Sequence, residues 1–388
     1  MDEDRATRRI RKDETSMMTR KTPFLIAALL GLWAAPAAAQ QTIKIGLVAP
    51  MTGAFAAAGQ SHATGAEMRV KEINAAGGKY KIELLVEDDA SNCNQSTNAT
   101  VKLITQDKVQ AVLGAVNSPC ALAMVPITQR YKVPQFTSGV GTAITQQGSE
   151  WVFRIAVAAT GQTKVLSEFA VKTLKHEKVA ILYSDDEYGA SMANGFKAGL
   201  AALNLQPAAM EIFPRNDQDF TGQLTSVKRS GATALYAVGA YTASALIAKQ
   251  AKQLGMNLQL LGDTGNASPK YIELGGDAVE GAVLVEPFTP ADPDAKNQEF
   301  VQRYKSQFGR EPDGWVAEVY DTVGMIHEAV TKADKADPKV IRDHVAAFTE
   351  GSPYKGMLGN WAFDKAGDAS FPLYKVQIKN GAKTILAR

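Results

Sequence analysis

A buried strand, a glycine-rich turn and an amphipathic helix follow one another between residues 43 and 78, and this order constrains the fold most. Ile43, Ile45 and Leu47 belong to a short apolar run that proline and glycine end, after which apolar residues recur at helical spacing. Ligands of open α/β sheets dock at the carboxyl end of such a strand. Neither G-x-x-x-x-G-K-[ST] nor G-x-G-x-x-G can be read in the turn, so a nucleotide ligand is not implied.

Strand-like and helix-like segments continue to alternate along the chain, which is typical of βαβ units on a parallel sheet. One series closes near residue 137, and a second begins after residues 151–157. The predicted strands are 81–86, 111–114, 135–137, 179–183, 209–213, 235–238, 361–363 and 374–378. The predicted helices are 95–105, 121–131, 164–174, 192–203, 224–230, 245–254, 300–308, 316–332 and 338–348. The pattern favours an α/β protein, and so long a chain favours two domains.

The N-terminal residues 1–39 combine basic side chains with an apolar core of about a dozen residues that ends in three alanines. This is typical of a cleaved signal peptide. The alternative, a membrane anchor, needs about 20 apolar residues. We expect cleavage before Gln40 and a true start at Met17 or Met18. No cysteine ends the signal, so we expect a soluble periplasmic protein without a lipid anchor.

Charge and cysteine content exclude several classes of function. Without residues 1–39 the chain has equal numbers of basic and acidic side chains, which argues against a nucleic-acid partner. The four histidines are dispersed, and two cysteines make a poor zinc site, so we expect neither metal nor cofactor. Because Cys93 and Cys120 would be exported to an oxidising compartment, a disulfide is favoured over two buried thiols.

Five short motifs carry a resemblance to a known family over almost the whole chain. They are the MTG turn with TGAE and INAAGG, VEDDASNCNQ at 86–95, SDDEYG at 184–189, ND-x-DF at 216–220 and VEGAVLVEPF at 279–288. In this order they resemble the periplasmic binding proteins of the branched-chain amino acid ABC transporter type. The resemblance implies the type I periplasmic binding fold, with two doubly wound Rossmann-like lobes and parallel sheets joined by a three-strand hinge.

The resemblance also implies where the lobes divide. The N-terminal lobe would comprise 40–157 plus 287–371, and the C-terminal lobe 158–286 plus 372–388. The chain would cross between them near Val157, Glu286 and Phe371, forming a hinge that permits closure.

The strongest candidate site is GAVNSPC at 114–120, where Asn117 and Ser118 form the turn between a strand and a helix. Backbone N–H groups at a helix start and a serine hydroxyl can bind a carboxylate without a basic residue. The resemblance places a carboxylate-binding serine in this turn. The alternative is that Ser118 only caps its own helix.

The turn after the next strand, TSGVGTAIT at 137–145, is the second candidate. Its glycines would let a ligand approach the bare backbone. The family's turn supplies main-chain groups and a threonine hydroxyl to the ligand carboxylate, which maps to Gly139, Val140, Gly141 and Thr142, with the last two uncertain by one residue.

Aromatic residues are expected to complete the site. Tyr188 and Tyr241 each follow a predicted strand of the second lobe, where a tyrosine can line a groove, although either could merely pack a helix onto its own lobe. Trp315 begins a helix at a position where relatives place an aromatic residue over the ligand. Ordinary helix packing is the alternative for Trp315.

The turn LLGDTGNAS at 260–268 bears on the ligand's charge. Relatives carry a glutamate there that pairs with the ligand's α-ammonium group, and the aligned residue here is Thr264, preceded by Asp263. An unpaired ammonium in a dry cleft is costly. Either Asp263 takes the role or the ligand has no α-amino group, and the sequence slightly favours an aromatic or branched aliphatic acid over an amino acid. A second departure from the family is Ala58, where relatives often have an aromatic residue.

The expected function is therefore a periplasmic receptor that closes on a small carboxylate-bearing solute and delivers it to an inner-membrane ABC permease. We expect a monomer. A binding protein or sensor for amide or urea-type ligands on the same fold is the alternative. An enzyme is disfavoured because no G-x-S-x-G, H-E-x-x-H or complete cofactor motif occurs, and a DNA-binding regulator would not be exported.

Overall fold

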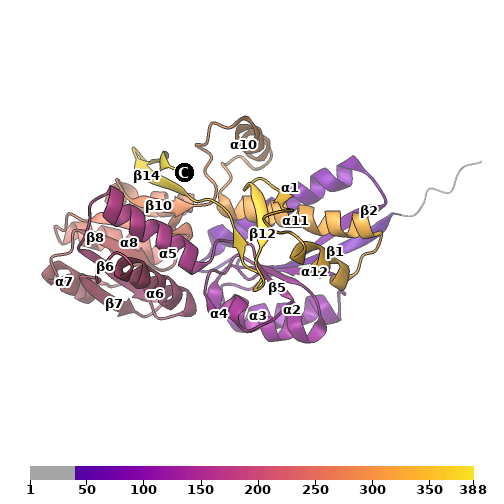
Figure 1. Cartoon of the computed structure of the whole chain (residues 1–388), viewed down its shortest axis with the longest axis horizontal. Helices are drawn as coiled ribbons and strands as arrows, with labels where there is room; N and C mark the ends of the chain where they lie inside the picture. Colours follow the sequence, from indigo (N-terminus) through magenta and orange to yellow (C-terminus); the bar gives the residue numbers. More distant parts are fainter. Residues whose placement is uncertain (1–39) are drawn as a thin grey trace, which may run out of the picture. The chain divides into compact units, whose positions relative to one another are not determined.

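The computed structural model describes residues 40–388, and Figure 1 traces them from β1 to the C-terminus. The predicted signal peptide, with its alternative starts at Met17 and Met18, lies outside the described residues. None of the helices that the structure describes is both long enough and apolar enough to cross a membrane.

A five-stranded parallel sheet forms from the N-terminal part of the chain, in the order β2-β1-β3-β4-β5. Its strands are β1 (Gln41–Ala49), β2 (Tyr80–Asp88), β3 (Ala111–Leu113), β4 (Gln135–Thr137) and β5 (Val152–Arg154). The central strand β1 pairs with β2 on one side and with β3 on the other. The apolar run that begins at Ile43 is fully buried as a result.

The helices that connect or cover this first sheet come from both ends of the chain. They are α1 (Ala56–Ala76), α2 (Cys93–Thr105), α3 (Ser118–Tyr131), α4 (Ala143–Gln146), α10 (Ala295–Phe308), α11 (Gly314–Ala333) and α12 (Pro338–Ala346). Helices α1 and α11 pack closely. Gly65 permits this approach, since a Cβ atom there would lie 2.5 Å from the backbone oxygen of Val316.

A seven-stranded sheet contains the second series, in the order β15-β14-β10-β9-β8-β6-β7. Its strands are β6 (Val179–Ser184), β7 (Ala209–Phe213), β8 (Ala234–Val238), β9 (Gln259–Gly262), β10 (Val283–Glu286), β14 (Tyr374–Lys379) and β15 (Ala382–Ala387). The first five of these strands run parallel, whereas β14 and β15 are antiparallel additions from the C-terminus.

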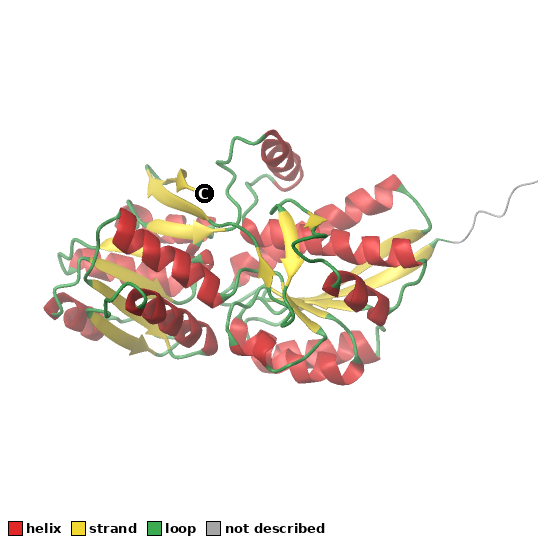
Figure 2. Cartoon of the chain, in the orientation of Figure 1, coloured by secondary structure: helices red, strands yellow, loops and turns green. Residues whose placement is uncertain are grey.

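Helices alternate with these strands in the chain (Figure 2). They are α5 (Ala159–Glu168), continued by a π-helical turn η1 (Phe169–Thr173), then α6 (Glu187–Ala201), α7 (Thr221–Arg229), α8 (Tyr241–Gln253) and α9 (Pro269–Gly275). Two 3₁₀ turns, η2 (Thr264–Asn266) and η3 (Gly276–Ala278), flank α9. This alternation and the two parallel sheets confirm the predicted α/β class.

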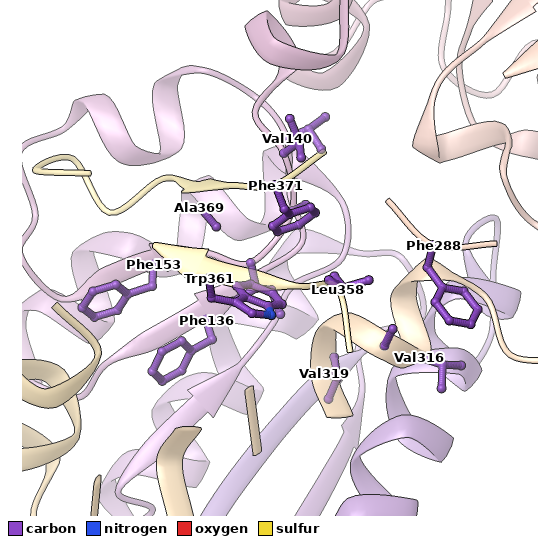
Figure 3. Close-up of a cluster of buried hydrophobic side chains, with 14 of the residues drawn as sticks. Phe136, Val140, Phe153, Phe288, Val316, Val319, Leu358, Trp361, Ala369 and Phe371 are labelled. Atoms are coloured by element: carbon purple, nitrogen blue, oxygen red, sulfur yellow. The ribbon is translucent and has the colours of Figure 1, made fainter. Parts of the chain in front are cut away.

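A third, small sheet packs over the aromatic core beside β5. Its strands are β11 (Tyr354–Lys355), β12 (Asn360–Phe363) and β13 (Ala369–Ser370). Strand β12 contains the buried Trp361, whose ring packs at a tilt against Phe371 with centroids 4.9 Å apart, while Phe136 and Phe153 lie nearby (Figure 3). The Trp361 indole N–H donates to Asp321 at 2.9 Å, which fixes the small sheet to α11.

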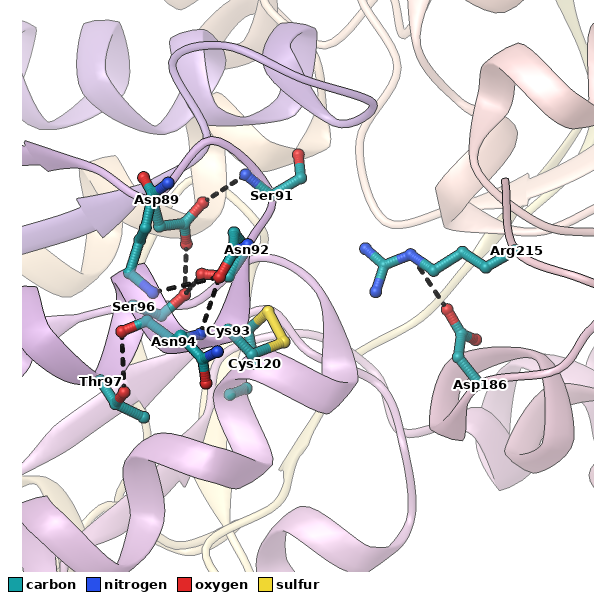
Figure 4. The surroundings of a disulfide bond; sticks show 12 residues. Asp89, Ser91, Asn92, Cys93, Asn94, Ser96, Thr97, Cys120, Asp186 and Arg215 are labelled. Atoms are coloured by element: carbon teal, nitrogen blue, oxygen red, sulfur yellow. Dashed lines mark hydrogen bonds and ion pairs between the residues drawn. A yellow bond between two sulfur atoms is a disulfide. The ribbon is translucent and has the colours of Figure 1, made fainter. Parts of the chain in front are cut away.

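The predicted disulfide is confirmed: Cys93 and Cys120 are bridged, with Cα atoms 4.3 Å apart (Figure 4). Cys93 is the first residue of α2, which Asn92 caps by accepting hydrogen bonds from the next amides. Cys120 lies two residues after Ser118. The bridge therefore fastens the turn that carries Ser118 to the neighbouring helix.

Candidate functional site

A small cavity lies where loops from both large sheets meet. Its lining residues are Phe55, Val116, Asn117, Ser118, Ser138, Val140, Tyr188, Thr264, Gly265 and Trp315. Most of these residues follow the carboxyl end of a parallel strand, where open α/β sheets bind ligands. The cavity is small: about 30 Å³ of it is accessible to the centre of a water molecule. The structure therefore brings together six of the predicted site residues: Asn117, Ser118, Val140, Tyr188, Thr264 and Trp315.

The start of α3 presents unused polar groups to this cavity. Asn117 is only 4% exposed, yet neither its amide nitrogen nor its amide oxygen has a hydrogen-bond partner. It precedes the first helical residue without capping it. Ser118 Oγ accepts a hydrogen bond from the amide of Gly141 at 2.9 Å. Ser118 therefore bonds to the neighbouring loop rather than capping α3, and its hydroxyl hydrogen is free to bind a ligand.

The loop after β4 reaches the cavity through Ser138 and Val140 rather than through its glycines. The amide of Gly139 donates to Thr137 Oγ1 at 3.0 Å, and that of Gly141 donates to Ser118. The amide of Thr142 donates to Ser191 Oγ at 3.0 Å. Gly139, Gly141 and Thr142 are thus not among the lining residues, and these contacts hold the loop in place instead.

On the side of the second sheet, Asp263 is fully buried behind the cavity wall. Its carboxylate accepts hydrogen bonds from the hydroxyls of Tyr188 and Tyr236, each at 2.6 Å, and from the amide of Gly265 at 2.7 Å. Burial raises the pKa of Asp263 and raises the pKa of Tyr188 well above its usual value. Asp263 therefore positions Tyr188 and the turn after β9 and does not face the cavity.

The aromatic residues that line the cavity differ in part from those expected from the sequence. Tyr241 does not line the cavity, and its hydroxyl accepts a hydrogen bond from the amide of Ala57 at 3.2 Å. Phe55, three residues before Ala58, lines the cavity instead, and the Arg215 guanidinium lies 5.6 Å from its ring centroid. An aromatic residue from the first turn is thus present, but three residues before the position at which relatives often have one.

Three polar residues that the sequence interpretation missed lie at the back of the cavity. Ser138 Oγ donates to Glu318 Oε2 at 2.6 Å and lies 2.9 Å from His62 Nε2. Burial lowers the pKa of His62 to about 3 and raises the pKa of Glu318 well above its usual value. The available signal was Glu318 itself, an acidic residue one turn after Trp315 in an otherwise apolar stretch of α11.

Among residues 40–388, no group of three or more histidine, cysteine, aspartate or glutamate side chains is arranged to hold a metal ion. The polar groups at the cavity are amides, hydroxyls and a carboxyl. Such groups can bind and orient a small polar molecule.

The two parallel sheets and the shared cavity define a protein that binds small molecules between strand ends. The chain belongs to the periplasmic binding protein family, whose model matches residues 42–383. This confirms the predicted family and the type I periplasmic binding fold.

Individual relatives agree with the family. The chain is 29% identical over 358 residues to the leucine-, isoleucine-, valine-, threonine- and alanine-binding protein of Pseudomonas aeruginosa, covering 90% of this chain and 93% of that protein.

Two solved structures are similar as well. The branched-chain amino acid transporter substrate-binding protein LivJ of Streptococcus pneumoniae, in complex with isoleucine, has a TM-score of 0.82 and 26% identity, covering 90% of this chain and 100% of that chain. An ABC transporter solute-binding protein of Rhodopseudomonas palustris, in complex with 3,4-dihydroxybenzoic acid, has a TM-score of 0.78 and 26% identity, covering 89% and 98%.

Proposed function

We propose that this protein is the periplasmic solute receptor of an ABC importer and that it binds a small carboxylate-bearing solute in the cavity described above. The unpartnered amide of Asn117 is the observation that carries the proposal. A buried amide without partners is costly, so a ligand that satisfies it would be bound strongly.

A carboxylate fits the start of α3 best. The first amides of a helix have no acceptor within the helix, and the helix dipole favours negative charge there. The hydroxyl of Ser118 and the side-chain NH₂ of Asn117 add two further donors next to these amides. The relatives support the proposal, because their names and complexes include branched-chain amino acids and a dihydroxybenzoic acid.

The proposed receptor has two lobes, 40–157 plus 287–371 and 158–286 plus 372–388, that close over the ligand. The separate sheets support this division, as does the pairing of the C-terminal strand β14 with β10. In this proposal the signal peptide 1–39 exports the protein, and the receptor delivers its solute to an inner-membrane permease. The receptor is a monomer and has no catalytic activity.

Thermal-shift measurements on residues 40–388 test the function. Leucine, 4-methylpentanoate, benzoate and 3,4-dihydroxybenzoate would be compared with the primary amides of the same acids. A ligand at 100 times its Kd adds about 2.7 kcal/mol of stability, so a true ligand shifts the unfolding midpoint clearly. We expect a shift with at least one carboxylate and none with its amide. A shift with the amides alone would favour the alternative amide or urea-type ligand.

The variant Ser118→Ala tests the contribution of a single residue of the site. Loss of a hydrogen bond to a charged ligand group weakens binding by about 1.5–3 kcal/mol. Ser306→Ala, which alters an exposed serine on α10, should leave the ligand-induced shift unchanged.

A further inference from the structure

Glu318 is a buried carboxyl group with a single hydrogen-bond donor. It is 1% exposed, and Ser138 Oγ is the only group among residues 40–388 that donates a hydrogen bond to its carboxyl. An ionised carboxylate in such surroundings is costly without a cation or further donors. To ionise in this position, Glu318 would need a partner that residues 40–388 do not supply.

The carboxyl of Glu318 lies next to the candidate ligand cavity. A second, smaller cavity is lined by Thr264, Trp315 and Glu318, among other residues. Thr264 and Trp315 also line the ligand cavity, as does Ser138, the hydrogen-bond partner of Glu318. Glu318 therefore lies next to the candidate ligand cavity, on the side of Thr264, where a threonine stands in place of the acidic residue of relatives.

None of the charged groups around Glu318 neutralises it. His62 on α1 reaches it only through Ser138, and burial holds the His62 pKa at about 3, so the imidazole is uncharged. Asp313, at the start of α11, is a second acid, and its repulsion raises the Glu318 pKa further.

The two cations that act on Asp313 have partners of their own. Lys383 pairs with the buried Glu286, and Arg310 hydrogen-bonds to Thr64 at 3.2 Å. Neither acts on Glu318, so an ionised Glu318 would need a cation from a molecule in the cavity.

Building on the proposed function, we propose that Glu318 is a specificity-determining residue that pairs with the α-ammonium group of an amino acid ligand. The carboxylate of that ligand would lie at Asn117 and Ser118. Asp263 fits this role less well, because its fully buried carboxylate holds two tyrosine hydroxyls and a backbone amide and Asp263 lines neither cavity. This proposal reverses the expectation drawn from the sequence, which slightly favoured a ligand without an α-amino group.

Binding then displaces a proton. In the free receptor, burial raises the pKa of Glu318, so its carboxyl keeps its proton to a higher pH than an exposed glutamate does. The ligand arrives with its ammonium group already charged, the O–H bond of Glu318 breaks, and the proton passes to the buffer as the ammonium N–H bonds to the carboxylate. Below the pKa of free Glu318, affinity for an amino acid should therefore rise tenfold per pH unit.

Calorimetric titration of residues 40–388 in two buffers of different ionisation enthalpy measures both affinity and proton release. The probes are two matched pairs, leucine with 4-methylpentanoate and phenylalanine with 3-phenylpropanoate. We expect one amino acid to bind at least tenfold more tightly than its deaminated partner and to release protons. Glu318→Gln, which keeps the shape of the neutral side chain, should abolish the release and weaken amino acid binding at least tenfold, while changing the binding of the deaminated acid less than threefold.

A rescue variant and a surface control sharpen the test. Combining Glu318→Gln with Thr264→Glu returns an acid to the position used by relatives and should restore amino acid binding. Glu299→Gln, on the exposed face of α10, should change nothing. The native protein's proton release needs no variant, so the test stands even if a variant does not fold.

Equal affinity for both members of a pair, or amino acid binding without proton release, would overturn the role of Glu318 and leave the carboxylate receptor intact. If none of the four probes binds but benzoates do, the proposed function stands and this inference fails. If no carboxylate binds at all, both fail.

Discussion

At the scale of single residues, two buried acids near the cavity differ in how the protein satisfies them. Asp263 accepts three hydrogen bonds, whereas Glu318 accepts one. Burial raises the pKa of both, but only the Glu318 carboxyl borders a cavity. The acid with three donors holds the cavity wall in place, and the acid with one donor can accept further hydrogen bonds from a ligand.

The raised pKa of Glu318 predicts a pH-dependent contribution to stability. Because the folded-state pKa lies above the ordinary value of 4.5, the folded protein holds the proton more tightly than the unfolded chain does. The contribution of Glu318 to the free energy of unfolding is fully present below the ordinary pKa. It is lost as the pH rises from there toward the folded-state pKa, by about 1.4 kcal/mol per pH unit. Glu318→Gln removes this loss.

Urea unfolding of the ligand-free native protein and of Glu318→Gln between pH 5 and pH 8 measures the effect. The variant should gain stability relative to the native protein as the pH rises. A difference that stays constant over this range would mean that Glu318 does not carry a proton in the folded protein.

At the scale of elements, helix α3 combines the disulfide and the candidate carboxylate site. The bridge between Cys93 and Cys120 closes a loop with a sequence separation of 27 residues. Loop-closure entropy for this length gives about 3–4 kcal/mol. We predict that the double variant Cys93→Ser, Cys120→Ser loses about this much unfolding free energy and also binds ligand more weakly, because Ser118 lies two residues from the bridge.

Denaturant unfolding of the double variant checks this prediction, and thiol titration of the unfolded native protein checks the bridge itself. No free thiol should react before reduction, and two should react afterwards. A stability loss below about 1 kcal/mol would contradict the account of the bridge.

The sequence predicts such elements well where local patterns decide them. The apolar run from Ile43, the turn at Ser118 and the helix at Trp315 could be located, because periodicity and turn residues mark them. The side-chain partners could not. Asp263 is occupied by the hydroxyls of Tyr188 and Tyr236, which come from distant strands and helices.

The position of Glu318 beside a cavity could not be predicted from the sequence either. Helix α11 is buried over most of its surface, so its periodicity does not distinguish a cavity-facing position from a core position. Likewise, the sequence located the loop after β4 but not which of its residues point into the cavity. That choice depends on bonds to Ser118 and Ser191, which lie elsewhere in the chain.

At the scale of the whole molecule, hydrogen bonds join the loop after β4 to helix α6. The amide of Thr142 donates to Ser191 Oγ at 3.0 Å, and that of Ala143 donates to Glu187 Oε1 at 3.3 Å. If the proposed lobes close on the ligand, these bonds form on closure and stabilise the closed form without touching the ligand.

We therefore predict that Ser191→Ala weakens ligand binding by roughly three- to tenfold, the equivalent of one ordinary hydrogen bond. Small-angle scattering of the native protein should show a smaller radius of gyration with saturating ligand than without it. An unchanged radius, together with unchanged affinity in the variant, would count against closure. Ser226→Ala, on α7, serves as the control.

The central claim is that the start of α3 binds the carboxylate of the solute, and calorimetric titration of Asn117→Asp tests it most directly. The variant keeps the shape of the side chain but replaces an unpartnered amide by a negative charge next to the ligand carboxylate. We predict at least a tenfold loss of affinity for the carboxylate that stabilises the native protein, with no loss in Asn257→Asp at an exposed loop position. Unchanged affinity in Asn117→Asp would contradict the carboxylate site.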